Sequence, residues 1–191
     1  MTRHVTRRRH DATGRSTGRF ADPRFRKMNK PPSGEPWLWL TREILESYAW
    51  RALSSSGQKV VCRIGLEHLA HGGCQNGDLP VTYRVFEAYG IGPNSISPAL
   101  AEAVELGLIE RTAIGHRAWG EFKGSPARYA LGWLPFHDGR PAGDHWRRFG
   151  SLAEARQAAN RARQFVENER QRKRADRSGV VVKRRPRAVN Q

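Results

Sequence analysis

The 191-residue sequence contains only two cysteines, Cys62 and Cys74, which are too few for a disulfide framework. It has no run of about 18 or more apolar residues, so we expect no membrane-spanning helix. The basic N-terminus, MTRHVTRRRH, is not followed by the apolar segment of a secretory signal. These absences indicate a protein of a reducing, cytoplasmic compartment without a membrane partner.

Motifs of common enzyme classes are also missing. There is no G-x-x-x-x-G-K-[ST] phosphate-binding loop and no G-x-S-x-G nucleophile elbow. One group of potential metal ligands has the pattern C-x5-H-x2-H-x2-C: Cys62, His68, His71 and Cys74. A second group lies in a glycine-containing segment: His137, Asp138, Asp144 and His145. The first spacing differs from zinc fingers and ribbons, and the second group would need more acidic residues to hold a catalytic metal. We therefore expect no metal, no cofactor and no enzymatic activity.

Acidic residues are scarce at both ends of the chain. Residues 1–34 hold ten basic and two acidic residues, and residues 151–191 hold twelve and four, whereas residues 35–150 hold twelve of each. The formal net charge of +16 therefore comes entirely from the two ends. Basic segments bind polyanions by neutralising phosphates and releasing counterions, which favours a nucleic-acid partner over a role in solubility alone.

The hydrophobic patterns predict a mainly α domain with a small β-hairpin, an α+β fold, between basic extensions. Ser151 and Glu154 form a capping box, which predicts the start of a helix. Its apolar stripe is thin, consisting of Ala155, Ala159 and Ala162 and ending at Phe165 and Val166, so weak docking, pairing with a partner and a free helix all stay open. The N-terminal arm and the C-terminal tail lack periodicity and are predicted to be disordered. The predicted division is a basic arm at 1–34, a domain at 35–136, a linker at 137–150, a basic helix at 151–177 and a basic tail at 178–191.

Within the domain, WLWL at 37–40 alternates like a short strand, and we expect Trp37 and Trp39 in the core. Thr41 is predicted to cap a helix from Arg42 to about Tyr48. A helix capped by one of Ser54, Ser55 or Ser56 is predicted to end near His71, where GGCQNG (72–77) turns the chain. Its buried face is predicted from apolar spacing to be Cys62, Gly65, Leu66 and Leu69. Further strands are predicted at 108–114 and 128–134, the second with Tyr129, Leu131 and Trp133 facing the core.

Two short helices joined by the turn at 90–93, followed by a strand hairpin, are the element order of a winged helix-turn-helix. The second helix is predicted to begin at Asn94 or Ser97 as its N-cap. Its buried stripe is predicted to be Ile96, Leu100, Ala103 and Val104. Its outward positions are then Asn94, Ser95, Ser97, Pro98, Ala101, Glu102 and Glu105.

Four segments carry a family resemblance: SYAWRALS (47–54), GGCQNG (72–77), VTYRVFEAYGI (81–91) and SISPALAEAVELGLIE (95–110). In this order and spacing they resemble short winged helix-turn-helix proteins of bacterial phages, plasmids and integrated elements. They are also similar to the N-terminal domains of some replication initiators. The resemblance implies a winged-helix fold, DNA binding, and a role in transcription regulation or DNA replication of a mobile element.

On this interpretation the second helix enters a major groove, while the wing and the basic ends contact phosphates. Contacts to bases are expected from Asn94, Ser95 and Ser97. Contacts to phosphates are expected from Arg84, Arg111, Arg117, Lys123 and Arg128. Because the outward side has no arginine to bind guanine, we expect salt-sensitive, modestly selective binding to double-stranded DNA by a cytoplasmic, nucleoid-associated protein. The alternatives are a winged-helix adaptor for a protein partner and RNA binding through the arginine-rich tails.

Overall fold

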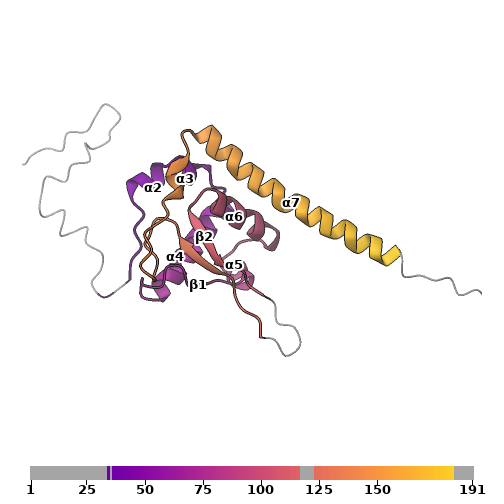
Figure 1. Cartoon of the computed structure of the whole chain (residues 1–191), viewed down its shortest axis with the longest axis horizontal. Coiled ribbons are helices and arrows are strands. Elements are labelled where there is room, and N and C mark those ends of the chain that lie inside the picture. The colour runs from indigo at the N-terminus through magenta and orange to yellow at the C-terminus, as the bar shows by residue number, and fades with distance from the viewer. Residues whose placement is uncertain (1–33, 35, 117–122, 183–191) are drawn as a thin grey trace, which may run out of the picture. The chain divides into compact units, whose positions relative to one another are not determined.

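The computed structural model describes Gly34 and residues 36–116 and 123–182, with side chains up to Asp176. The elements lie in one unit that begins at Pro36 and combines helices with a small antiparallel sheet (Figure 1). The helices are α2 (Arg42–Glu46), α3 (Tyr48–Ala52), α4 (Ser55–Ala70), α5 (Tyr83–Ala88), α6 (Pro93–Glu105), the 3-10 turn η1 (His145–Arg148) and α7 (Leu152–Val182). The strands are β1 (Leu79–Pro80), β2 (Ile109–Ala113) and β3 (Arg128–Leu131). The architecture is therefore α+β.

The segment before α2 is not a strand, and its tryptophans are not core residues. Trp37 and Trp39 are 46% and 57% exposed and stack on each other with ring centroids 4.9 Å apart. The alternation in WLWL was misleading because no described strand lies beside this segment to form a sheet with it. The segment is held instead by a hydrogen bond in which the Trp133 indole N–H donates to the Trp39 carbonyl at 2.9 Å. Thr41 then caps α2, as predicted, by accepting from the Ile44 N–H.

Helix α4 starts at the predicted cap, since the Ser54 hydroxyl accepts from the Gly57 N–H at 3.0 Å. Its buried face differs from the prediction: Cys62 and Leu66 are exposed and Leu69 is half-buried. The buried residues are Gly57, Val60, Val61, Ile64, Gly65 and His68. Two apolar faces fit the helical spacing, and the branched side chains of Val60, Val61 and Ile64 fill the core.

The sheet has the strand order β1-β3-β2, with both pairings antiparallel. A bulge between Arg111 and Ala113 shifts the register of β2, and a bridge between His116 and Ser125 extends the β2–β3 hairpin. Tyr129 faces the core as predicted and packs edge-on against Phe86, with ring centroids 6.2 Å apart. The strands are shorter than predicted.

The segment expected as a linker contributes to the core through Trp146 and Phe149, both buried.

A buried asparagine, Asn76, holds the chain between β3 and this segment in place. The Asn76 side-chain amide donates to the Leu131 and Leu134 carbonyls at 3.1 and 3.0 Å, and its Oδ1 accepts from the Leu131 N–H at 2.7 Å. Asn76 therefore joins the turn before β1 to the end of β3.

Helix α7 packs against α3 and α6 through buried alanines: Ala155, Ala158 and Ala159. At its start the Ser151 hydroxyl accepts from the Glu154 N–H at 3.2 Å. The small side chains let the helices approach closely, which explains why a thin stripe is enough for docking. Although α7 is 31 residues long, neither it nor any other described helix is apolar enough to cross a membrane.

Candidate nucleic-acid interface

Helix α6 begins earlier than predicted, with its N-cap two residues before Asn94 and five before Ser97. Gly92 is the N-cap and Pro93 occupies the first turn, so neither Asn94 nor Ser97 caps the helix. Proline suits this place because it needs no backbone N–H there and its φ is already helical. Ile96, Ala99, Leu100 and Ala103 face the core. Val104, predicted to be buried, is 38% exposed.

The outer side of α6 is not free, because α7 lies on it. Glu102 was expected to face outward, yet its side chain is completely buried. Its carboxylate accepts from the Arg163 guanidinium of α7 and from the backbone N–H of Ser54, the latter at 3.1 Å. The Ser54 hydroxyl donates to the same carboxylate. The prediction failed because the partner of Glu102 is 61 residues away in the sequence.

Glu102 also sits at the N-terminal end of α4, where the helix dipole favours a negative charge. Gly57, in the first turn of α4, is buried, and a Cβ at this position would collide with the Glu102 carboxylate. One carboxylate thus joins α4, α6 and α7. We call the contact of Glu102 with Arg163 and Ser54 the Glu102 junction.

A second contact fixes the direction of α7. Arg170 donates to the backbone carbonyl of Asn94 at 2.8 Å, near the start of α6, whereas Arg163 meets Glu102 near its end. Helices α6 and α7 therefore run antiparallel. A DNA major groove is about 12 Å wide and admits one helix of about 10–12 Å diameter. Helix α6 therefore does not fit into a major groove along its length while α7 is docked.

The three residues expected at bases differ in accessibility. Asn94 is exposed, and Ser95 and Ser97 are half-buried. The Ser97 hydroxyl shares a hydrogen bond of 2.6 Å with the Tyr83 hydroxyl. Of the three, only the side chain of Asn94 is fully open to solvent.

The residues expected at phosphates have different surroundings. Arg84 on α5 and Lys123 on the hairpin are exposed, and neither pairs with another residue in the described ranges. Arg111 lies beside the hydroxyl of Tyr129, whose pKa is raised by burial and lowered in part by Arg111. Arg128 forms an ion pair with Asp78. Arg117 lies outside the described residues.

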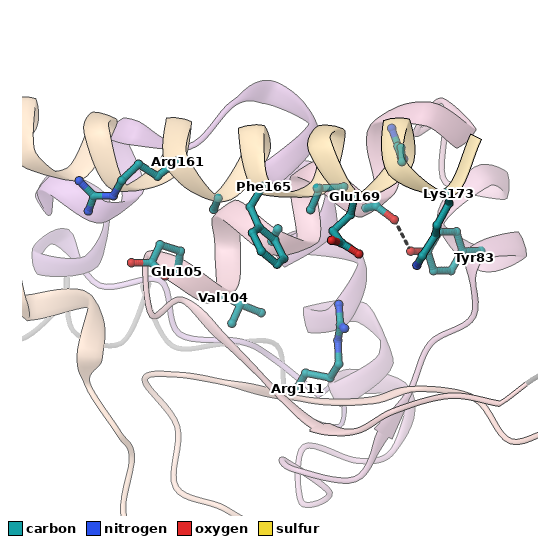
Figure 2. Close-up of a pocket in the computed structure, with 13 residues that line it drawn as sticks. Tyr83, Val104, Glu105, Arg111, Arg161, Phe165, Glu169 and Lys173 are labelled. Carbon is teal, nitrogen blue, oxygen red and sulfur yellow. Dashed lines mark hydrogen bonds between the residues drawn. The ribbon is translucent and has the colours of Figure 1, made fainter. Parts of the chain in front are cut away.

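An open groove of about 800 Å³ lies beside α6, between α7 and β2 (Figure 2). Figure 2 shows Phe165 pointing from α7 toward Val104, and Arg111 facing α7 from β2. Phe165 is 68% exposed, and Tyr83 of α5 is 47% exposed at the same groove. We call this site the α6–α7 groove and define it by Tyr83, Val104, Arg111, Arg161, Phe165 and Lys173.

The groove has more unpaired positive than negative charge. Its two carboxylates have arginine partners: Glu105 pairs with Arg148 at 3.1 Å and Glu169 pairs with Arg172 at 3.5 Å. Arg161 and Lys173 form no ion pair within the part of the chain that the structure describes. The sequence analysis did not select either residue, or Phe165. The available signal was a large aromatic residue at the end of an alanine stripe.

The C-x5-H-x2-H-x2-C residues do not form a metal-binding cluster. Among the residues described, no group of three or more histidine, cysteine or acidic side chains is placed to hold a metal. Cys62 and Cys74 are exposed free thiols. His68 is buried, its Nδ1 has no hydrogen-bond partner among the described residues, and burial together with the nearby His71 lowers its pKa.

No family model matches the sequence, and neither a curated protein nor a solved structure matches the chain.

Proposed function

We propose that the chain is a non-enzymatic DNA-binding protein of the winged helix-turn-helix class, acting in transcription or replication of a mobile element. In this proposal α4, α5 and α6 are the three helices of the motif, and the β2–β3 hairpin is the wing. The strand order β1-β3-β2 and the position of α6 directly before β2 support this assignment.

The observation that carries the proposal is a pair of exposed cations, one on α5 and one on the β2–β3 hairpin, in a charge-balanced domain. Residues 35–150 have equal numbers of acidic and basic residues, yet Arg84 and Lys123 are exposed and without described partners. Several carboxylates, in contrast, are already paired with arginines, as Asp78 is with Arg128. Exposed cations that form no ion pair with a carboxylate are available to bind phosphates.

The docked α7 changes how DNA would be bound. Since α6 and α7 lie side by side, we propose that α7 stays in place and that α6 does not enter the major groove alone. The duplex is then held through phosphates by Arg84, Lys123 and the basic ends of the chain. Phosphate contacts carry no sequence information, so selectivity is low and depends on Asn94 at the exposed start of α6.

The test is a titration of labelled duplex DNA with the full chain, followed by fluorescence anisotropy at several salt concentrations. For B-DNA, the slope of log affinity against log salt changes by about 0.9 for each phosphate contact. The double variant Arg84→Ala/Lys123→Ala is therefore expected to flatten the slope by about 1.8. Arg42→Gln removes one exposed charge whose described partner is only Glu46 on the same helix, and it should leave the slope unchanged.

Two results would overturn the proposal. An equal slope for wild type and the double variant, with equal binding of duplex RNA, would assign binding to the tails alone. Absence of duplex binding at physiological salt would favour the protein adaptor.

A further inference from the structure

We infer that the α6–α7 groove is a binding site for a single strand of nucleic acid. This inference deepens the proposed function and rests on it. A duplex hides the faces of its bases in the stack, whereas a single strand exposes them to aromatic side chains. Single-strand sites combine such rings with cations that follow the phosphates.

The aromatic part of this combination is present in the groove. Phe165 is 68% exposed although it extends a stripe of buried alanines, and it points into the groove (Figure 2). Tyr83 presents a second ring from α5, held by its hydrogen bond to Ser97. Val104 lies in the same groove and is 38% exposed. These groups leave an apolar surface uncovered in the groove, and Phe165 is the most exposed of the aromatic side chains that the structure describes.

Charge complementarity selects the occupant. Arg111 comes from β2, and Arg161 and Lys173 come from α7, so cations line both sides of the groove. The groove carboxylates Glu105 and Glu169 are each paired with an arginine. A nucleic-acid strand carries regularly spaced phosphates and flat base rings, so it can contact both the cations and the aromatic side chains of the groove.

The spacing along α7 supports an extended ligand rather than a compact one. Arg161, Phe165, Glu169 and Lys173 succeed each other at intervals of four residues and line the groove together. With a rise of 1.5 Å per residue, Arg161 and Lys173 are about 18 Å apart along the helix axis. An extended strand of about four nucleotides, with three intervals between phosphates, spans this distance, which is at the lower end of the about 4–16 nucleotides bound by single-strand modules.

The experiment uses the full chain and a labelled oligothymidylate of about 12 nucleotides, which forms no duplex. Phe165→Ala is expected to weaken binding by about 5- to 100-fold, the range of losing one stacked base, with unchanged affinity for duplex DNA. Phe165→Trp keeps a stacking surface and should bind like wild type, whereas Phe165→Leu should resemble Phe165→Ala. Tyr89→Ala removes another exposed aromatic residue, one outside the groove, and should have no effect. Circular dichroism checks the fold of each variant.

Each other outcome has a defined meaning. If Phe165→Ala binds oligothymidylate as tightly as wild type, the groove is not the single-strand site. If Phe165→Leu binds oligothymidylate like wild type, the contact of residue 165 is apolar without base stacking, and the inference of a stacking site is overturned. If wild type binds duplex but not oligothymidylate, this inference fails while the proposed function stands, and if it binds neither, both fail.

Discussion

The Glu102 junction makes a quantitative prediction about what holds α7 to the rest of the protein. Arg163→Met keeps the aliphatic stem that packs between the helices but removes the charge that faces Glu102. Removing one partner of a buried ion pair costs about 3–5 kcal/mol because the other charge is left without compensation. Here the Arg163 side chain is 34% exposed, and Ser54 still donates two hydrogen bonds to the carboxylate. We therefore expect a loss of about 2–3 kcal/mol in the free energy of unfolding.

The assay is urea unfolding of the full chain, followed by far-ultraviolet circular dichroism. Arg161→Met is the matched control, because Arg161 lies on the same helix and has no described ion pair. It should change the stability by no more than about 0.5 kcal/mol. In a Glu102→Gln background the additional loss caused by Arg163→Met should fall below about 1 kcal/mol, since the buried charge is gone. The reasoning is refuted if the two losses add, or if Arg163→Met is as stable as wild type.

Three further predictions concern the packing of the domain. Gly57→Ala should lower the stability, because the added methyl group meets the Glu102 carboxylate. This loss should outweigh the preference of helices for alanine over glycine, which is about 1 kcal/mol. A urea midpoint equal to or above that of wild type would contradict this prediction. Asn76→Ala should lower the free energy of unfolding by at least about 2 kcal/mol, since it removes the hydrogen-bond partners of the Leu131 backbone N–H and carbonyl. A free energy of unfolding within about 0.5 kcal/mol of wild type would show that these hydrogen bonds do not stabilise the fold. The pKa of His68 in the folded state is lower than its ordinary value of 6.5, so the unfolded chain binds a proton at this residue more readily than the folded chain does. The free energy of unfolding should therefore fall as the pH drops below about 6.5 and be retained above it. His68→Gln should weaken this acid dependence between about pH 7.5 and 5.5, and an identical pH profile would assign it to other groups.

The sequence predicted the local elements well where short-range chemistry determines them. Thr41 and Ser54 cap the helices for which they were selected, and Tyr129 faces the core from β3. Caps involve residues three positions apart, and strand alternation has a period of two, so both are visible in a local window. The hairpin between β2 and β3 followed from the same kind of pattern.

Contacts between distant segments were not visible in the same way. The outward assignment of Glu102 assumed that nothing packs on α6, and the alanines of α7 gave too weak a hydrophobic stripe to predict docking there. Asn76 lies in GGCQNG, which was interpreted only as a turn, although its side chain bonds to the backbone of β3. In these cases the residue that forms the contact lies many positions away in the sequence. The hydrophobic pattern around a polar or small residue does not indicate which distant residue it contacts.

The same principle explains what was missed at the candidate site. Arg84, Asn94 and Lys123 were selected from the helix-turn-helix pattern, and the structure places them on exposed surface. The α6–α7 groove exists only because α7 returns to α6, so the sequence of α7 alone marks Phe165 as an unusual aromatic residue but does not place it or Lys173 at a groove.

The most direct test of the central claim, that DNA is bound with α7 docked on α6, is the affinity of Arg163→Met for duplex DNA. The variant loosens α7 and uncovers the outer side of α6. If α7 belongs to the binding form, the affinity should stay equal or fall relative to Arg161→Met, which has the same net charge. An affinity about tenfold or more above that of Arg161→Met would show that α7 hides a DNA-binding helix, and would contradict the account.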